Sequence, residues 1–306
     1  MKLFAPEYVK IFKCIADKCR HSCCIGWEID IDENTLARYE RMPDKSIIST
    51  VEKDCDSGMC HFRLGSGGRC ANLTEGGLCR IIIEHGEEYL SEICREHPRF
   101  YNRTARGLEV GIGMSCEAAC KIILESDDYK KIREYGETYS ETVSIIEFDA
   151  VEEREKIYGI LSNSTLAYSD KISKIYELYE IPKEFFIDSE RWQDALNDLE
   201  YLDESHKTDF LCFDAKVKVD APLERLLIRA LAYYVYRHTS AADSMRDFRA
   251  SLTLSLFLER LYATLLSRVK APLKDETYEL ARIISEELEY SEDNIESLLF
   301  EIDFSL

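Results

Sequence analysis

Cysteine is the residue type whose number and spacing in this sequence indicate chemistry. The chain has 12 cysteines in 306 residues, and eleven of them lie between Cys14 and Cys120. The first residues contain no apolar segment of the length that a secretory signal needs. We therefore expect a cytoplasmic protein, and in that reducing compartment clustered cysteines bind metals more often than they form disulfides.

The clustered cysteines fall into four groups along the chain. We expect the metal ligands to be among Cys14, Cys19, Cys23, Cys24, Cys70, Cys79, Cys94 and Cys116. Soft thiolates favour zinc or iron. A tetrahedral zinc site is typically built from paired C-x2–4-C units, whereas ligands scattered over so long a segment suit an iron–sulfur cluster held by several loops. Eight candidates exceed the four that one centre needs, so both one and two centres are compatible with the spacing.

The sequence assigns no catalytic residue and no cofactor-binding residue. A radical-type enzyme would show C-x3-C-x2-C, but glycine and isoleucine occupy positions 26 and 123, where the third cysteine would stand. Gly111-Ile-Gly113 is a candidate for a nucleotide-binding turn, since it follows an expected strand and precedes an expected helix. The alternative for these glycines is a strand end that another chain segment approaches closely. The sequence assigns no role to His61, His85, His206 or His238.

The elements that must position the cysteines differ between the two parts of the chain. Residues 1–125 are expected to form an irregular, cysteine-rich metal-binding region with short helices at 33–41 and 86–94 and a strand at 107–114. A longer helix is expected to begin at Ser115 and end near Gly136. Residues 126–306 are expected to form an acidic, all-helical domain, so the fold class is mainly α. The expected helices span residues 150–162, 164–180, 189–203, 221–238, 241–269, 274–289 and 291–301.

Charge is distributed as unevenly as cysteine. The chain has 59 acidic and 39 basic side chains, a net charge of −20, of which residues 1–120 carry −3 and residues 121–306 carry −17. Such a charge repels a phosphate backbone and argues against nucleic-acid binding. No apolar stretch long enough for a membrane span occurs. The acidic part either attracts a lysine-bearing protein at long range or only keeps the chain in solution.

The order of the cysteine motifs resembles the flagellin lysine-N-methylase family. The matching elements are Cys19…Cys23-Cys24-x-Gly26-Trp27, Cys70-x-x-Leu73…Gly77-Leu78-Cys79, Cys94-x-x-x-Pro98-Arg99 and Ser115-Cys116. The same elements more loosely resemble a CxxCxxCC zinc- or iron-chelating family. The resemblance implies methylation of flagellin lysines by S-adenosylmethionine, with a cysteine-bound [4Fe-4S] cluster. One departure is that Glu117 follows Cys116 where the family pattern has proline.

A second hypothesis explains the same cysteines without catalysis. The protein would then be a metal-binding module, with zinc or an iron–sulfur cluster, that serves interaction or redox sensing. The two hypotheses differ in whether S-adenosylmethionine binds. They also differ in whether a lysine-bearing protein becomes methylated.

Overall fold

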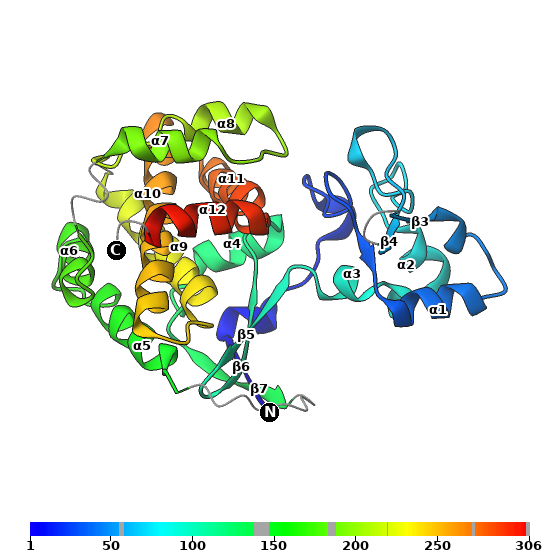
Figure 1. Ribbon diagram of the computed structural model, residues 1–306, viewed down its shortest axis with the longest axis horizontal. Coiled ribbons are helices and arrows are strands. Elements are labelled where there is room, and N and C mark those ends of the chain that lie inside the picture. The colour runs from blue at the N-terminus through cyan, green and yellow to red at the C-terminus, as the bar shows by residue number, and fades with distance from the viewer. Residues whose placement is uncertain (55–57, 138–146, 183–187, 219, 271–272, 304–306) are drawn as a thin grey trace. The chain divides into compact units, whose positions relative to one another are not determined.

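The computed structural model describes residues 1–54, 58–137, 147–182, 188–218, 220–270 and 273–303. Residue contacts divide the chain into two units (Figure 1). One, the helical unit, contains Met1–Phe12 and Phe100–Leu306, and the other, the cysteine-rich unit, contains Lys13–Arg99. This division differs from the boundary expected after residue 125, because the first strand and the chain from Phe100 onward belong with the helices.

A small mixed sheet opens the helical unit. Its strand order is β5-β6-β1-β7, and the strands are β1 (Lys2–Pro6), β5 (Arg99–Thr104), β6 (Gly107–Ile112) and β7 (Ile132–Glu137). β1 pairs in parallel with β6 and antiparallel with β7. β6 confirms the strand expected at 107–114, whereas β7 occupies the end of the segment expected to be helical up to Gly136. The helix there is shorter, because α4 (Glu117–Glu125) ends at Ser126.

Two long helices form the centre of the helical unit. α9 (Ala221–Thr239) and α10 (Met245–Arg268) pack along each other, and most side chains of α10 are buried. α4 and α5 (Ala150–Leu161) pack against α9, while α11 (Lys274–Ile284) and α12 (Glu292–Asp303) pack against α10 (Figure 1). Tyr233, Tyr234 and Tyr236 of α9 are buried in this core.

The remaining helices of this unit are short. They are α6 (Tyr168–Leu178), α7 (Ser189–Asn197), α8 (Glu204–Phe210), the 3-10 turn Glu7–Ile11 and the π-helical turn Ser285–Glu289, which continues α11. The helix expected at 189–203 corresponds to α7, which ends at Asn197, and α8, which begins at Glu204, was not predicted. The other helices expected after residue 150 are confirmed to within a few residues at their ends, apart from α6, which begins later. Among the described residues, none of the helices has both the length and the apolar composition needed to cross a bilayer.

A buried ion pair joins the sheet to helix α5. Arg154 of α5 is fully buried, and its two terminal nitrogens each donate a 2.6 Å hydrogen bond to a carboxylate oxygen of Glu109 in β6. The guanidinium also lies 4.8 Å from the centre of the Tyr236 ring. Because each charge is buried, either one alone would be strongly unfavourable in this core.

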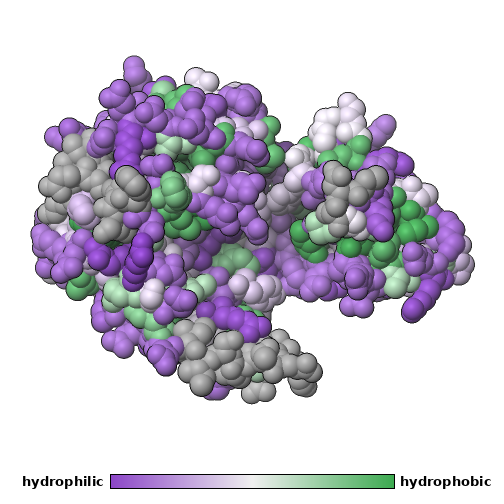
Figure 2. All heavy atoms as spheres, viewed as in Figure 1, coloured by the Kyte–Doolittle hydropathy of each residue, from purple (hydrophilic) through white to green (hydrophobic). Residues whose placement is uncertain are grey.

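The cysteine-rich unit has a smaller core. Its elements are α1 (Glu33–Arg41), α2 (Arg80–His85), α3 (Glu92–Glu96), the antiparallel sheet β2-β4-β3 and short 3-10 turns; the strands are Asp30–Ile31, Cys60–Phe62 and Val51–Lys53. Eight buried side chains form the core, and Cys24, Cys60, Cys79 and Cys94 pack against it. Apolar side chains also reach the surface over α2, where Ile83 is 59% exposed (Figure 2).

The short helices of this unit follow local signals only in part. α1 confirms the helix expected at 33–41, and Asp32 caps it by accepting a hydrogen bond from the Thr35 amide. The expected helix at 86–94 is wrong. Gly86 has a φ of 102° and ends α2, a turn follows, and α3 begins only at Glu92. A positive φ at glycine typically ends a helix rather than opening one.

Candidate metal centre

Two glycines allow two cysteine-bearing loops to approach each other. The Gly26 amide donates a 3.0 Å hydrogen bond to the Gly68 carbonyl, and the Cys70 amide donates a 2.8 Å bond to the Cys24 carbonyl. A Cβ atom on Gly68 would lie 3.1 Å from the Gly26 nitrogen, and the φ of Gly68 is +68°. Glycine is therefore required where these loops meet, and the loops bring Cys24 next to Cys70.

The loop after Cys70 returns to place Cys79 nearby. Leu73 and Cys79 form an isolated antiparallel bridge, and the Leu73 amide donates a 2.9 Å bond to the Cys70 carbonyl. Cys79 is the N-cap residue of α2. The pKa of its thiol is raised by burial, although the Ile82 and Ile81 amides donate to the sulfur and oppose that shift. Backbone donors at a helix start stabilise a thiolate, so this position suits a metal ligand.

Cys94 belongs to a helix that is tied to α1. The Glu92 amide at the start of α3 donates a 3.0 Å hydrogen bond to the carboxylate of Asp32, the same side chain that caps α1. Burial, together with charge repulsion from Cys24, Cys79 and Cys70, raises the pKa of Cys94 to about 12. Cys24, Cys70, Cys79 and Cys94 are therefore close enough to one another to interact.

The thiol pKa values of the neighbouring Cys23 and Cys24 are shifted in opposite directions. The hydrogen bond between their side chains raises the pKa of Cys23 and lowers the pKa of Cys24 to about 7. Ser22 and the nearby Arg69 guanidinium also favour the Cys24 thiolate. The Trp27 indole donates a 2.7 Å hydrogen bond to the Cys23 carbonyl, which fixes the turn after the pair.

The remaining candidate ligands are less closely associated. Cys14 is near enough to Cys23 to affect its pKa, whereas the Cys19 thiol donates a 3.0 Å hydrogen bond to the His21 carbonyl. Cys116 belongs to the helical unit, where it is the N-cap residue of α4 and packs against the helical core. Its spacing in the sequence does not show to which unit it belongs, because that depends on tertiary contacts.

The spacing of the sulfur atoms bears on the kind of metal. Zn–S bonds of about 2.3 Å in a tetrahedral site place the sulfurs about 3.8 Å apart. In the part of the chain that the structure describes, no three cysteine sulfurs lie within 4.8 Å of one another. A four-iron cluster binds one thiolate on each iron and so holds its ligands further apart than a single ion does.

His97 lies at the end of α3, close to the same loops. Burial lowers its pKa to about 4, so the imidazole is neutral near pH 7. Its ring contacts the Trp27 ring edge-on, with 5.6 Å between the ring centres. The structure therefore gives His97 a packing contact with the turn that follows Cys23 and Cys24.

A second group of metal-binding side chains was not apparent from the sequence. Asp44, Glu84 and His85 place their ligand atoms within 4.8 Å of one another, and the His85 Nε2 atom lies 3.3 Å from the Asp44 carboxylate. Both carboxylates are exposed. Exposed acidic pairs of this kind are common in proteins without a bound ion. The sequence did not indicate this group, because Asp44 and Glu84 are far apart along the chain.

The glycines considered for a nucleotide-binding turn have a different role in the fold. A Cβ atom on Gly111 would lie 2.2 Å from the Phe100 ring, and one on Gly113 would lie 2.2 Å from the Tyr290 hydroxyl. Neither glycine has a φ in the left-handed region. The alternative expectation, a strand end that other segments approach closely, is therefore confirmed.

Comparison with known proteins gives matches to one group. A lysine-N-methylase of Salmonella typhimurium is 28% identical over 136 residues, which is 42% of this chain and 34% of that protein. A flagellar biosynthetic protein FliU of Salmonella muenchen is 28% identical over 130 residues, which is 40% of this chain and 77% of that protein. This chain is similar to lysine-N-methylases. The resemblance predicted from the cysteine motifs is thereby confirmed.

The match to the lysine-N-methylases is partial. The aligned segment spans about a third of the length of the curated lysine-N-methylases, including a second one from Salmonella choleraesuis. No protein-family profile matches the chain, and no solved structure matches it significantly.

Proposed function

We propose that this protein transfers a methyl group from S-adenosylmethionine to lysine side chains of flagellin. We further propose that its cysteine-rich unit binds a [4Fe-4S] cluster. The similarity to lysine-N-methylases supports the reaction, and the flagellar name of the FliU relative supports the substrate. The observation that carries the metal part is the convergence of Cys24, Cys70, Cys79 and Cys94.

The donor set fits an iron–sulfur cluster chemically. Cys70, Cys79 and Cys94 have raised thiol pKa values because burial disfavours their thiolate forms. A bound metal centre supplies the positive charge that a buried thiolate needs, and it displaces the thiol protons on binding. Among the described residues, no three cysteine sulfurs lie within 4.8 Å of one another, which favours a cluster over zinc, the alternative metal.

The centre has a structural role in this proposal. The four cysteines come from two glycine-dependent loops, the start of α2 and α3. A cluster, when bound, would cross-link all four and stabilise the unit. Because the core of this unit is small, metal binding would contribute a large part of its folding free energy.

Methyl transfer places separate demands on the protein. The lysine amine must lose its proton before it can attack, so the site must provide a base or lower the amine pKa. The amine, the methyl carbon and the sulfonium sulfur must also be aligned at near-attack distance.

The acidic charge supports recruitment of a lysine-bearing partner. Residues 121–306 carry a net charge of −17, and an excess of one sign accelerates encounter with a partner of the opposite sign. The same charge disfavours nucleic acid as a partner. We infer that the encounter takes place in the cytoplasm, where thiols stay reduced and metal binding is favoured.

The direct test is a methyl-transfer assay. The full chain, purified without oxygen, is incubated with methyl-labelled S-adenosylmethionine and flagellin from the same cell, and lysine methylation is mapped by mass spectrometry. We expect label on flagellin lysines, and no label when S-adenosylhomocysteine is in excess. Absence of both methyl incorporation and S-adenosylmethionine binding by calorimetry would contradict the enzymatic proposal.

One observation favours a second candidate function, a redox sensor without catalysis. The pKa of Cys24 is lowered to about 7 by its hydrogen bond to the neighbouring Cys23 thiol. A partly exposed cysteine with thiolate character is typical of redox-reactive sites. This function predicts bound metal, no affinity for S-adenosylmethionine and a visible spectrum that changes with oxidant.

A further inference from the structure

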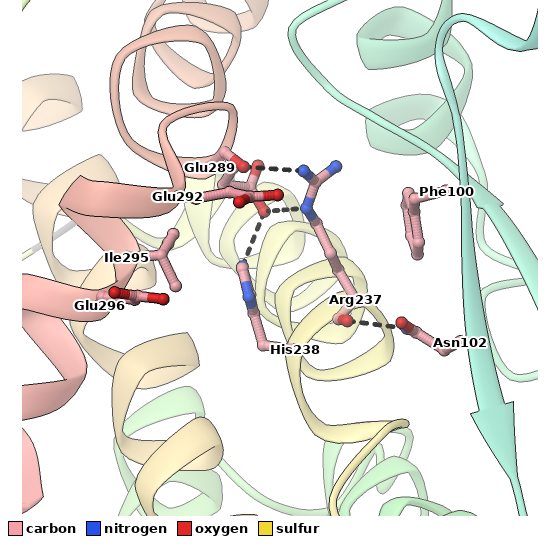
Figure 3. Close-up of a pocket in the computed structure, with 8 residues that line it drawn as sticks. All are labelled: Phe100, Asn102, Arg237, His238, Glu289, Glu292, Ile295 and Glu296. Atoms are coloured by element: carbon pink, nitrogen blue, oxygen red, sulfur yellow. Dashed lines mark hydrogen bonds and ion pairs between the residues drawn. The ribbon is translucent and has the colours of Figure 1, made fainter. Parts of the chain in front are cut away.

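A pocket in the helical unit brings together an acidic wall and a buried histidine–glutamate pair. Its volume is about 320 Å³, within the usual range of small-molecule sites. β5 provides one wall and α12 the facing wall, while the end of α9 and the π-helical turn lie between them (Figure 3). The lining residues are Phe100, Asn102, Arg237, His238, Glu289, Glu292, Ile295 and Glu296.

Glu289 is the fixed anion of this pocket. Its side chain is fully buried, and it accepts hydrogen bonds from the Tyr233 hydroxyl at 3.1 Å and pairs with Arg237 Nε at 3.2 Å. Burial alone would raise its pKa, but the Arg237 charge and the His238 hydrogen bond outweigh burial and lower it. Glu289 is therefore ionised at neutral pH.

His238 is oriented by this anion. Its Nε2 atom lies 2.8 Å from a carboxylate oxygen of Glu289 (Figure 3), and the ring is 10% exposed. With the proton on Nε2 directed to Glu289, the lone pair of Nδ1 is free to accept a proton. No hydrogen bond to Nδ1 is found among the described residues. A histidine with one nitrogen bound to a buried carboxylate is the arrangement of a general base.

The acidic wall gives the pocket its selectivity for charge. Glu292 and Glu296 lie one turn apart on α12, and no ion pair joins either of them to another residue in the described part of the chain. Among the described residues that line the pocket, three are glutamates and Arg237 is the one with a guanidinium. The Arg237 guanidinium already pairs with Glu289. Its central carbon also lies 4.8 Å from the centre of the Phe100 ring and 4.8 Å from the centre of the Tyr290 ring.

We propose that this pocket binds the side chain of the lysine that accepts the methyl group, with its amine among Glu292, Glu296 and His238. This inference rests on the proposed function and names the acceptor site for it. Phe100 and Ile295 supply apolar surface for the alkyl chain, and the carboxylates attract the ammonium before it is deprotonated.

The chemical step is balanced with the residues present. The lysine ammonium gives one proton to His238 Nδ1, and the resulting imidazolium is stabilised by Glu289. The neutral amine nitrogen then forms a bond to the methyl carbon of the sulfonium donor. The carbon–sulfur bond breaks with its electron pair on sulfur, which leaves a neutral thioether and a methylammonium product. His238 is a catalytic residue in this step, whereas Glu289 is a positioning residue.

Binding is tested independently of catalysis. Nα-acetyl-lysine amide is titrated into the full chain with ¹⁵N-labelled histidine, and the His238 ring signals are followed by NMR; Nα-acetyl-norleucine amide is the uncharged control. We expect the lysine probe alone to shift these signals. The Glu292→Gln/Glu296→Gln double variant should bind it about ten-fold more weakly, because two favourable charges are removed. Asp293→Asn, an exposed change on the same helix, should leave binding unchanged.

Catalysis is tested with the same variants. The double variant should raise KM for the acceptor with little change in kcat. His238→Gln, which retains a donor for Glu289, should lower kcat about 10²- to 10⁴-fold. Charged groups around His238 are Arg237 on its own helix, Glu289 on the π-helical turn and Glu292 and Glu296 on α12, whereas β5 contributes the uncharged Phe100 and Asn102.

The outcomes separate the two proposals. If the wild-type protein binds the lysine probe at His238 but methylates nothing, the proposed activity fails and only lysine binding by the pocket stands. If the wild-type protein methylates flagellin while both variants retain full activity, the pocket assignment is overturned. Equal binding of the lysine and norleucine probes would also overturn it. Because Glu292 and Glu296 are exposed, their double variant is expected to fold, so a misfolded His238→Gln protein would not prevent the test.

Discussion

The Cys70 amide donates a 2.8 Å hydrogen bond to the carbonyl of Cys24. This bond joins two cysteine groups that are distant in the sequence, and it forms beside the contact between Gly26 and Gly68. The position of two proposed metal ligands therefore depends on backbone geometry rather than on a large apolar core. Changes to that backbone should affect metal binding even though they touch no cysteine.

Gly68→Ala should weaken both folding and metal binding. The new Cβ would meet the Gly26 backbone at 3.1 Å, and alanine is strained at a φ of +68°. We expect a loss of about 1–3 kcal/mol in the free energy of unfolding, together with a lower metal content. The measurements are denaturant unfolding and metal analysis.

Gly159→Ala is the control, because nothing lies within 4 Å of its added Cβ in α5. Since alanine is favoured over glycine in a helix, this variant should be more stable by about 0.5–1 kcal/mol.

Removing the metal should unfold one unit selectively. If the cluster holds Cys24, Cys70, Cys79 and Cys94, its loss should abolish hydrogen-exchange protection within residues 13–99. The strands and helix of residues 100–125 belong to the helical unit, so they should keep their protection. Exchange mass spectrometry before and after treatment with an iron chelator measures this. Equal loss of protection in residues 13–99 and 100–125 would argue against a metal confined to the cysteine-rich unit.

Glu109→Gln should be strongly destabilising. It leaves the fully buried Arg154 charge without its bidentate partner, and an unpaired buried charge costs about 3–5 kcal/mol. Thermal and denaturant unfolding measure the effect. The exposed pair between Arg246 and Asp303 is the matched control, and Asp303→Asn should change stability by less than about 1 kcal/mol. Similar losses in both variants would show that burial of the Arg154 pair does not determine its importance.

His206 should make part of the stability pH-dependent. Its hydrogen bond to the buried Glu287 carboxylate, 2.6 Å long, raises the His206 pKa. A pKa raised on folding adds stability that is fully present below the unfolded value of about 6.5 and is lost as pH rises through the folded pKa. The stability difference between the wild-type protein and His206→Gln should therefore be larger at about pH 6 than at about pH 9. A difference that grows with pH would contradict this assignment.

Local signals in the sequence predict much of the helical fold but little of the pairing between distant segments. Asp32 and the apolar spacing after it predict α1, and Asp149 and Pro222 mark the starts of α5 and α9. β1 was not predicted, because a five-residue strand ending in Pro6 gains its stability from β6 and β7, which are far along the chain.

The candidate sites, too, could be predicted from the sequence only in part. The cysteine spacing predicts a metal site, but it does not show that Cys94 and Cys116 belong to different units, because that depends on tertiary contacts. The pair of His238 and Glu289 gave no sequence signal, since neither a motif nor a periodicity connects α9 with the π-helical turn. Gly111 and Gly113 gave a signal that fits two structures, and the contacts with Phe100 and Tyr290 decide between them.

The identity of the metal ligands is tested most directly by iron and acid-labile sulfide analysis of anaerobically purified full-length protein. The wild-type chain should contain about four of each per molecule and show broad visible absorbance. Serine at Cys24, Cys70, Cys79 or Cys94 should reduce both contents sharply, whereas Cys212→Ser, in the helical unit, should leave them unchanged. A wild-type protein that folds without metal, or four serine variants with wild-type iron content, would contradict the proposed centre.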